Sequence, residues 1–204
     1  MGFFQSLFGA KKSPRVNITP DNVWLTTDSK FSGLSKELRS RSPEDTIAVL
    51  LVAHFPDVLT RLKKIAAENH LVPTLAIPAS QIKPDIAAAL HLDENATVDI
   101  IVAERHPLRE IDERLKQFAA ELPCRCRITH HLSMEDPLLR LFVNDRTRKL
   151  MQQIMSAGES IQSNMVSQRI KSAQDRIEAS CRSPRDADSA ENWIEQNCPD
   201  AKSD

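Results

Sequence analysis

The sequence predicts an α/β fold: a doubly wound, mostly parallel sheet of about five strands, with helices on both faces and further helices after it. One observation is the strand, helix and strand that follow one another between residues 98 and 142. Another is the apolar run TIAVLLVAHF, typical of a parallel strand covered on both faces. A third is that helical patterns separate successive strands, as the crossovers of a parallel sheet do.

The central unit, residues 98–142, is the most clearly patterned part of the chain. Residues 98–102 form an apolar, β-branched run that predicts a buried strand. A helix is predicted next, because apolar side chains recur every three or four residues at Leu108, Ile111, Leu115, Phe118 and Leu122. The stretch CRCRITHHL then predicts the second strand. Strand, helix and strand in this order are the unit of a layered α/β domain.

The N-terminal half predicts three more strands with helices between them. A short strand is expected over 23–26 and a helix over 29–41, before the apolar strand TIAVLLVAHF. Pro56 opens the next helix at a position where proline lacks no hydrogen bond. VPTLAIP reads as a further strand. Residues 79–97 predict one or two short helices around 82–92 in place of another strand.

The last third of the chain predicts helices. One begins behind Ser133 and the acidic pair Glu135 and Asp136, runs through DPLLRLFVNDRTRKLMQQIMS and stops at Gly158. A second carries its apolar stripe from Ile161 to Ile177. The expected segments are an N-terminal amphipathic segment, an α/β domain, a helical extension packed on that domain and a polar tail, at 1–17, 18–135, 136–182 and 183–204 respectively.

Composition limits the function classes. The 204 residues suit one domain with appendages, and a net charge of −1 gives no global electrostatic reason to bind nucleic acid. Only four glycines occur, and none forms a phosphate-cradling loop beside a Gly-Lys-Ser/Thr sequence. No apolar run approaches the length of a membrane span. We therefore expect no cofactor and no nucleic-acid partner.

Four phrases resemble one family in the same order and at similar spacing. AERHPLREIDERL and LSMEDPLLRLF resemble the last helicase motif region of the SecA preprotein translocase ATPase, in its second, C-terminal RecA-like motor domain. DNVWLTTDSKFSGLSKEL resembles the start of that domain, and ESIQSNMVSQRIKSAQDRIEA the helical segment after it. The resemblance implies a RecA-like, P-loop-NTPase-like fold as a degenerate stand-alone version.

The departures from this family concern its nucleotide-facing residues. In SecA, the helix after the ERH phrase runs into a glycine- and arginine-rich loop whose arginines face the γ-phosphate of ATP, whereas Phe118 and Glu121 stand here. Neither side chain can place a positive charge on a phosphate. Another glycine-rich motif of that domain is also replaced by a stretch without glycine, between Ala76 and Val98. The sequence therefore predicts a protein that is not an enzyme.

The N-terminal segment MGFFQSLFGAKKSPR has the pattern of an interfacial helix. Its apolar side chains would share one face with lysines after it, at Phe3, Phe4, Leu7, Phe8, Lys11 and Lys12. Such a segment places its rings at the acyl boundary of a bilayer and its lysines at anionic headgroups. The alternative is that the segment frays or tucks its rings onto the domain. We expect a cytoplasmic protein, with peripheral contact at the inner face of the membrane if residues 1–12 bind lipid.

Two groups of polar residues invite a chemical reading. Cys124, Cys126 and His130 alternate along one strand, but zinc normally takes four ligands, and ordinary half-buried strand residues explain the pattern as well. We therefore expect no metal site. The other group follows the ends of strands, where α/β sheets place ligands, and consists of His54, Glu104, Arg105, His106 and Asp112. Salt bridges and helix capping are the alternative to a new active site there.

Two functions follow from these patterns. The first is a non-catalytic SecA-like module that binds a protein partner or a membrane surface and is associated with protein translocation. The alternative is a nucleotide- or metal-dependent enzyme or sensor, with a site re-formed at the carboxyl ends of the strands.

Overall fold

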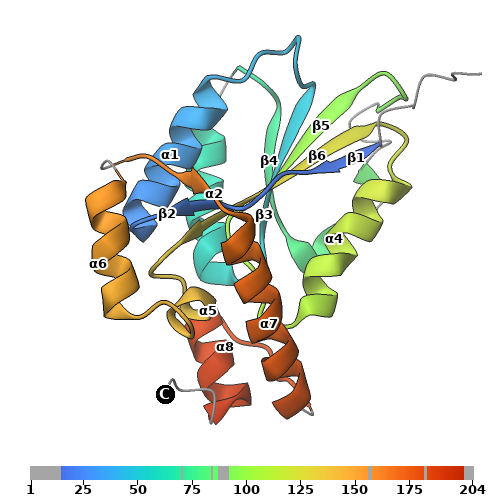
Figure 1. Ribbon diagram of the computed structural model, residues 1–204. Helices are drawn as coiled ribbons and strands as arrows, with labels where there is room; N and C mark the ends of the chain where they lie inside the picture. Colours follow the sequence, from blue (N-terminus) through green and yellow to red (C-terminus); the bar gives the residue numbers. More distant parts are fainter. Residues whose placement is uncertain are drawn as a thin grey trace, which may run out of the picture.

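The computed structural model describes residues 15–69, 71–83, 85–86, 92–155, 158–181 and 183–199. Within them a mostly parallel sheet carries helices on both faces (Figure 1), which confirms the predicted α/β fold class. The strand order is β4-β3-β5-β6-β2-β7, and β1 also pairs with β6. The strands are β1 (Val16–Ile18), β2 (Asn22–Trp24), β3 (Ala48–Ala53), β4 (Thr74–Pro78), β5 (Thr97–Val102), β6 (Arg125–Ser133) and β7 (Ile161–Gln162).

The sheet of the described residues has seven strands where about five were expected. The difference arises at β6, a nine-residue strand along which β1 and β2 pair one after the other. Val16 pairs with Cys126 near the start of β6, and Trp24 pairs with Ser133 at its end. The remaining strand, β7, has two residues and is antiparallel to β2. The parallel pairs β4-β3, β3-β5 and β5-β6 form the layer that the sequence predicted.

Alternate residues of the central strands fill two separate cores. Val49 and Leu51 of β3 face helices α1 (Thr27–Arg39) and α2 (Pro56–Glu68), which cover one face of the sheet. Leu50 and Val52 face the opposite way, toward helix α4 (Arg109–Glu121). Side chains of adjacent residues in a strand point to opposite faces, so a near-continuous apolar run requires helices on both.

Helix α1 begins two residues earlier than the sequence suggested, because Thr26 caps it. The Thr26 side chain accepts a hydrogen bond from the backbone N–H of Ser29, so β2 ends at Trp24. Gly33 of α1 lies against the ring of Trp24, where an added Cβ would come within 1.9 Å of the indole. The glycine therefore allows α1 to approach the sheet at this point.

The C-terminal third differs from the two predicted helices. Where the sequence predicted one helix, the structure has two, α5 (Pro137–Arg140) and α6 (Asp145–Ile154). The second begins because the Asn144 side chain accepts a hydrogen bond from the backbone N–H of Thr147. Ile161 lies in β7 and not in a helix, and α7 (Asn164–Ser180) begins after the cap residue Ser163. A further helix, α8 (Ala190–Asn197), lies within the segment expected to be a polar tail.

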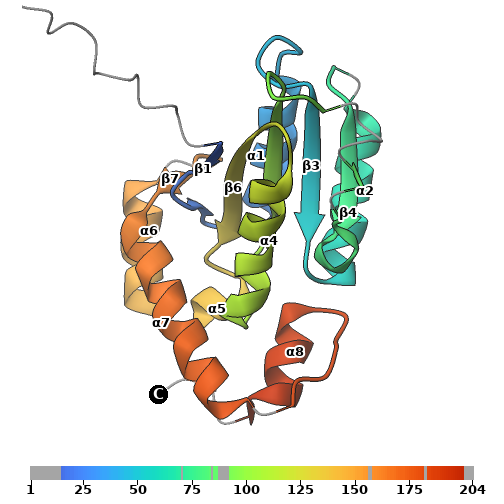
Figure 2. The ribbon, with the colours of Figure 1, turned by 90° about the vertical axis from the view of Figure 1, so that its right-hand side faces the viewer.

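Helices α5, α7 and α8 gather at the end of the molecule toward which the parallel strands run (Figure 2). There they form a third core with Leu132 and Met134, and Trp193 of α8 is buried in it. Of the segment 79–97, the described part contains a 3-10 turn, η1 (Ala79–Gln81); the helix expected around 82–92 falls largely outside the described residues. None of the described helices is long and apolar enough to cross a membrane.

Candidate functional site

The five polar residues predicted at the strand ends lie together at the carboxyl edge of the sheet. His54 follows β3, the triplet of Glu104, Arg105 and His106 follows β5, and Asp112 lies in the first turn of α4. Because β3 and β5 are adjacent and parallel, the residues after them meet at one edge. This is the edge that α5, α7 and α8 cover.

Asp112 is the centre of this group. Its Oδ1 accepts a 2.9 Å hydrogen bond from the backbone N–H of His106 and lies 3.1 Å from His54 Nε2. Its Oδ2 accepts from Gln174 Nε2 at 2.9 Å and lies 3.3 Å from Arg105 Nη1. Burial alone would raise the pKa of Asp112, but the hydrogen bond from His54 and the charge of Arg105 outweigh it and hold that pKa well below its ordinary value. The carboxylate therefore stays ionised.

Arg105 joins this carboxylate to the N-terminal part of the chain. Its second terminal nitrogen, Nη2, donates to Asp21 Oδ1 at 2.5 Å. The other oxygen of Asp21 accepts a 2.6 Å hydrogen bond from the hydroxyl of Ser167 in α7. His130 of β6 is buried beside Asp21, with 3.7 Å between His130 Nδ1 and Asp21 Oδ1. The network thus links the segment before β2, the end of β5, α4 and α7.

Sequence reasoning missed Asp21, Ser167 and Gln174. One signal could have found Gln174: it stands four residues after Ile170, within the buried stripe of α7 that also contains Ala173 and Ile177. A polar residue on a buried helix face requires a hydrogen-bonding partner. Gln174 finds two, since it also donates to the carbonyl oxygen of His106 at 2.8 Å. Nothing local in the sequence indicates Asp21 or Ser167, whose partners are distant in the chain.

Glu104 is a buried carboxyl whose pKa lies near neutrality. Burial raises its pKa to about 7, against the lowering effect of His54 and Lys30. Its Oε1 accepts hydrogen bonds from the backbone N–H groups of His54 at 2.8 Å and of Phe55 at 3.0 Å. A carboxyl with such a pKa can give or take a proton at physiological pH.

His106 is held neutral inside an aromatic group. Burial, followed by the charge of His54, lowers its pKa to about 3. Its Nδ1 accepts a 2.9 Å hydrogen bond from the backbone N–H of Leu108. Its ring stacks on Phe55 at a centroid distance of 5.3 Å and meets the ring of Trp193 edge-on at the same distance. The contact with Trp193 brings α8 against the ends of the strands.

A cavity of about 740 Å³ lies between these strand ends and α8. His54, Phe55 and His106 line its inner side, and Asn192, Trp193 and Gln196 contribute from α8. Apolar side chains form much of the remaining wall, among them Leu59, Ile82, Ile111, Leu115 and Phe118. The volume is that of a small-molecule pocket, with ionisable groups at one end.

The described residues hold no group of three or more His, Cys, Asp or Glu side chains arranged to bind a metal ion. Cys124 and Cys126 lie side by side with 3.8 Å between their sulfur atoms, and both are buried in the core under α4. His130 and His131 are buried as well. Among the described residues, Asn22 and Trp24 form hydrogen bonds with the ring of His131, whereas neither ring nitrogen of His130 has a hydrogen-bond partner.

The two positions at which the resemblance leads one to expect arginines lie near the C-terminal end of α4. Phe118 is buried against the sheet and lines the cavity, and Glu121 is exposed at the last turn. The membrane-contact residues predicted from the sequence, Phe3, Phe4, Leu7, Phe8, Lys11 and Lys12, lie outside the described residues.

A second surface of interest lies on α6. No residue of this helix is buried, although it is strongly amphipathic. Leu150 and Ile154, one helical turn apart, are 54% and 67% exposed. Met165 in the first turn of α7 is also exposed. We call Leu150 and Ile154 the α6 face.

The chain is similar to SecA proteins. Residues 61–159 match the family model described as the SecA P-loop domain. Protein translocase subunit SecA of Prochlorococcus marinus (strain MIT 9515) is 30% identical over 173 residues, which are 82% of this chain and 18% of that protein. SecA of Paraburkholderia xenovorans (strain LB400) is 42% identical over 94 residues, or 45% of this chain and 10% of the relative. The chain thus spans less than a fifth of the length of these relatives.

These matches correct one prediction. The chain was expected not to be an enzyme, because it lacks glycine-rich phosphate loops and the arginines of the SecA loop. A match to a SecA P-loop domain instead relates the chain to an ATPase family, so that expectation is wrong. Loss of particular motifs did not justify it, because the chain as a whole still matches members of that family.

Proposed function

We propose that this chain, which is SecA-like over most of its length, acts in protein translocation as a counterpart of the second motor domain of SecA and does so by binding a protein partner. The relatives are named protein translocase subunits. The α6 face is the observation that supports a partner most directly. Two large apolar side chains in one row on an amphipathic helix are typical of a surface that another protein covers.

The hydrogen-bond network at the strand ends supports the same proposal. Asp21, Arg105, Asp112 and Gln174 connect four elements through hydrogen bonds among their own side chains. The domain is therefore preformed, and a preformed body loses little conformational entropy when it binds. We infer that a SecA-type translocase is the partner, because a domain that matches a small part of a large protein can occupy a contact that the large protein makes internally.

Direct binding to purified SecA tests this proposal. The double substitution Leu150→Glu and Ile154→Glu should weaken binding at least about tenfold, since it places two charges in an apolar contact. Leu71→Glu is the matched control, because Leu71 is equally exposed but lies before β4 and not on α6. Absence of binding, or equal binding by both variants, would contradict the proposal.

The N-terminal segment remains a candidate for membrane contact, which would place the protein in the cytoplasm with a peripheral position at the inner face of the membrane. Its pattern of phenylalanines followed by lysines supports this expectation. Co-sedimentation with anionic liposomes, compared between the full chain and a chain lacking residues 1–12, tests it. Equal sedimentation of the two chains would remove the membrane from the proposal.

A second candidate function is a nucleotide-dependent activity at the strand ends. It is favoured by the cavity of about 740 Å³ that His54 and His106 line, by Glu104, which accepts from the N–H of His54 and has a pKa of about 7, and by the likeness to a SecA P-loop domain. A thermal-shift screen with ATP and ADP, with and without Mg²⁺, would detect binding, since a ligand of the folded state raises its melting temperature. Turnover of ATP that falls in Glu104→Gln would support this candidate, and no shift with any nucleotide would exclude it.

A further inference from the structure

We propose that Cys181 and Cys198 form a reversible disulfide that fixes α8 over the cavity at the carboxyl ends of the strands. The four cysteines of the chain are all free thiols and fall into two neighbouring pairs. One pair, Cys124 and Cys126, lies within the core. The other lies at the ends of two helices, and the two settings differ in what they allow the sulfur atoms to do.

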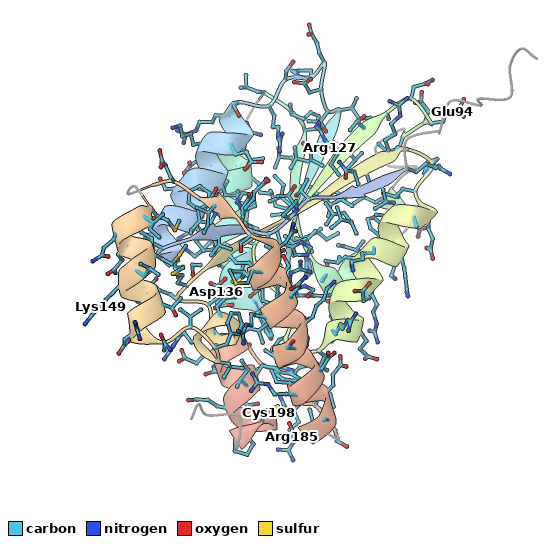
Figure 3. The ribbon with its side chains drawn as sticks, viewed as in Figure 1. Glu94, Arg127, Asp136, Lys149, Arg185 and Cys198 are labelled. Atoms are coloured by element: carbon cyan, nitrogen blue, oxygen red, sulfur yellow. The ribbon has the colours of Figure 1, made fainter. Side chains whose placement is uncertain are left out.

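Cys181 and Cys198 end adjacent helices. Cys181 follows α7 and Cys198 follows α8, and each donates its backbone N–H to the last turn of its own helix. The ends of α7 and α8 lie side by side in two perpendicular views (Figures 1 and 2), and Figure 3 shows Cys198 at this end of the molecule. The two side chains pack into the same apolar cluster, and the Cys181 thiol is near enough to Cys198 to contribute to the raised pKa of the Cys198 thiol. A disulfide brings the two sulfur atoms to about 2.05 Å from one another.

The pair at Cys124 and Cys126 cannot close in the same way. Their sulfur atoms are 3.8 Å apart, but Cys124 lies in the bend before β6, and Cys126 is held in the sheet by its pairing with Val16 and Val98. A disulfide prefers Cβ atoms about 3.8 Å apart. Both thiols are also fully buried beneath α4, out of reach of an oxidant. This pair is a built-in control for the other.

The proposed bond would add a covalent link to a helix that an Arg140–Glu191 ion pair and several hydrogen bonds also hold. Residues 183–189 connect α7 to α8 without regular structure. Asn197 closes this connection by accepting from the N–H of Arg185 at 2.7 Å and donating to its carbonyl at 3.0 Å. The carbonyl of Asp188 accepts a 3.2 Å hydrogen bond from the N–H of Asp57 at the start of α2. Since Asn192, Trp193 and Gln196 line the cavity, movement of α8 would open it.

A low-molecular-weight disulfide such as oxidised glutathione can supply the oxidising equivalents. Burial, together with the neighbouring Cys181 thiol, raises the pKa of Cys198 to about 11, so its thiolate is scarce. Cys181, which is only half-buried, therefore makes the first attack. It forms a mixed disulfide and releases one glutathione thiolate. Cys198 then loses its proton, attacks the Cys181 sulfur and releases the second, so two protein thiols are oxidised while one glutathione disulfide is reduced to two thiols.

Thiol counting and mass spectrometry test the bond. After treatment of the full-length reduced chain with oxidised glutathione, two of its four thiols should be lost, and a non-reduced digest should contain the peptide that joins Cys181 to Cys198. Cys181→Ser and Cys198→Ser should each abolish this peptide, whereas Cys126→Ser should keep it. Four remaining thiols, or a bond between Cys124 and Cys126, would overturn the proposal.

Hydrogen exchange tests the effect on α8. Because the bond closes a loop of roughly 17 residues, it should raise Tm by about 5 to 10 °C. Amides of α8 should exchange roughly tenfold more slowly in the oxidised than in the reduced chain. Cys181→Ser, treated in the same way, should show neither change. A bond that forms without slowing exchange in α8 would refute its role in holding the cavity closed.

Discussion

Asp99 in β5 and Asp112 in α4, beyond the end of that strand, are both buried aspartates that contact arginine, but their charges are stabilised in different ways. Asp99 lies in β5, and Arg127 donates to it from Nε at 2.5 Å and from Nη2 at 3.0 Å, with Arg41 Nε 3.1 Å away. Both guanidinium groups extend from the surface, and the Arg127 side chain is 35% exposed. Asp112, beyond the other end of β5, is held by Arg105, which is 13% exposed, and by partners that are buried.

The difference shows where a lost partner would be replaced by water. Arg41 and Arg127 can turn into solvent if Asp99 changes, so one end of the strand tolerates substitution. Arg105, His54 and Gln174 have less freedom to do so, because Arg105 is only 13% exposed and the other two side chains are buried. A buried charge without its partner is far more costly than an exposed one. Substitutions at Asp112, Glu104, Asp99 and Ile154 should therefore have effects on stability that decrease in this order.

Asp112→Asn should be the most damaging change. The groups that face the carboxylate are donors, namely the N–H of His106, the amide of Gln174 and the guanidinium of Arg105. The NH₂ group of Asn would face one of these donors and could not accept a hydrogen bond from it. Arg105 would also lose the negative charge of Asp112 as its partner. We expect a loss of about 3 to 5 kcal/mol in the free energy of unfolding. Urea denaturation measures it, and a loss below about 1 kcal/mol would remove the contrast.

Glu104→Gln should change how stability depends on pH. Because the pKa of Glu104 is raised from 4.5 to about 7, its contribution is complete below pH 4.5 and is lost as pH rises through 7. Gln cannot ionise, yet its carbonyl can still accept from the N–H groups of His54 and Phe55. The stability of the variant relative to the native chain should therefore rise by roughly 2 to 3 kcal/mol between pH 5 and pH 8.

Denaturation of both chains at each pH gives this difference directly. His106, with its pKa lowered to about 3, contributes stability that is lost as pH falls below about 6.5. That loss occurs in both chains and cancels in the comparison. A difference that stays constant with pH would show that Glu104 is ionised in the folded protein throughout this range.

Asp99→Asn should cost less than Asp112→Asn, about 1 to 2 kcal/mol. The Asn carbonyl can still accept from one arginine, and water can solvate the other. The same urea titration serves for both variants. Equal losses at Asp99 and Asp112 would show that solvent access does not decide the cost.

Ile154→Glu should have the smallest effect on folding, within about 0.5 kcal/mol, because the side chain is exposed on α6. The same substitution adds a charge to the surface that we propose for a partner. A Tm equal to that of the native chain would show that lost binding is not lost folding. A large fall in Tm would mean that Ile154 packs within the domain in solution.

Sequence patterns predicted the strands and helices of the layered part of this fold, because these elements follow from the spacing of apolar residues along the chain. The apolar run of β3 and the three-and-four spacing of α4 describe faces that must be buried, and both elements lie close to their predicted bounds. The patterns failed where a single side chain determines where a helix begins or ends. Asn144 divides one predicted helix into α5 and α6, and a cap of that kind competes with a continuous apolar period.

The strand-end residues could be predicted as a group because parallel strands bring their ends together, but their partners could not. Asp21 and Ser167 are 146 residues apart, and neither stands in a pattern that points to the other. Trp193 is similar: its burial against His106 depends on the path of residues 183–189, which no periodicity specifies. Contacts between distant segments are fixed by packing, not by local pattern.

The position of β1 and β2 along β6 has a consequence for synthesis on the ribosome. The hydroxyl of Thr19, between β1 and β2, forms a hydrogen bond with that of Thr129 in β6, 110 residues further along the chain. Strands β1 and β2 therefore leave the ribosome long before their partner strand β6 has been synthesised. Until then their open edges are available to any other extended segment nearby. Slow translation of the region between them would lengthen that exposure and favour premature aggregation, and a chaperone that shields residues 16–24 would counter it.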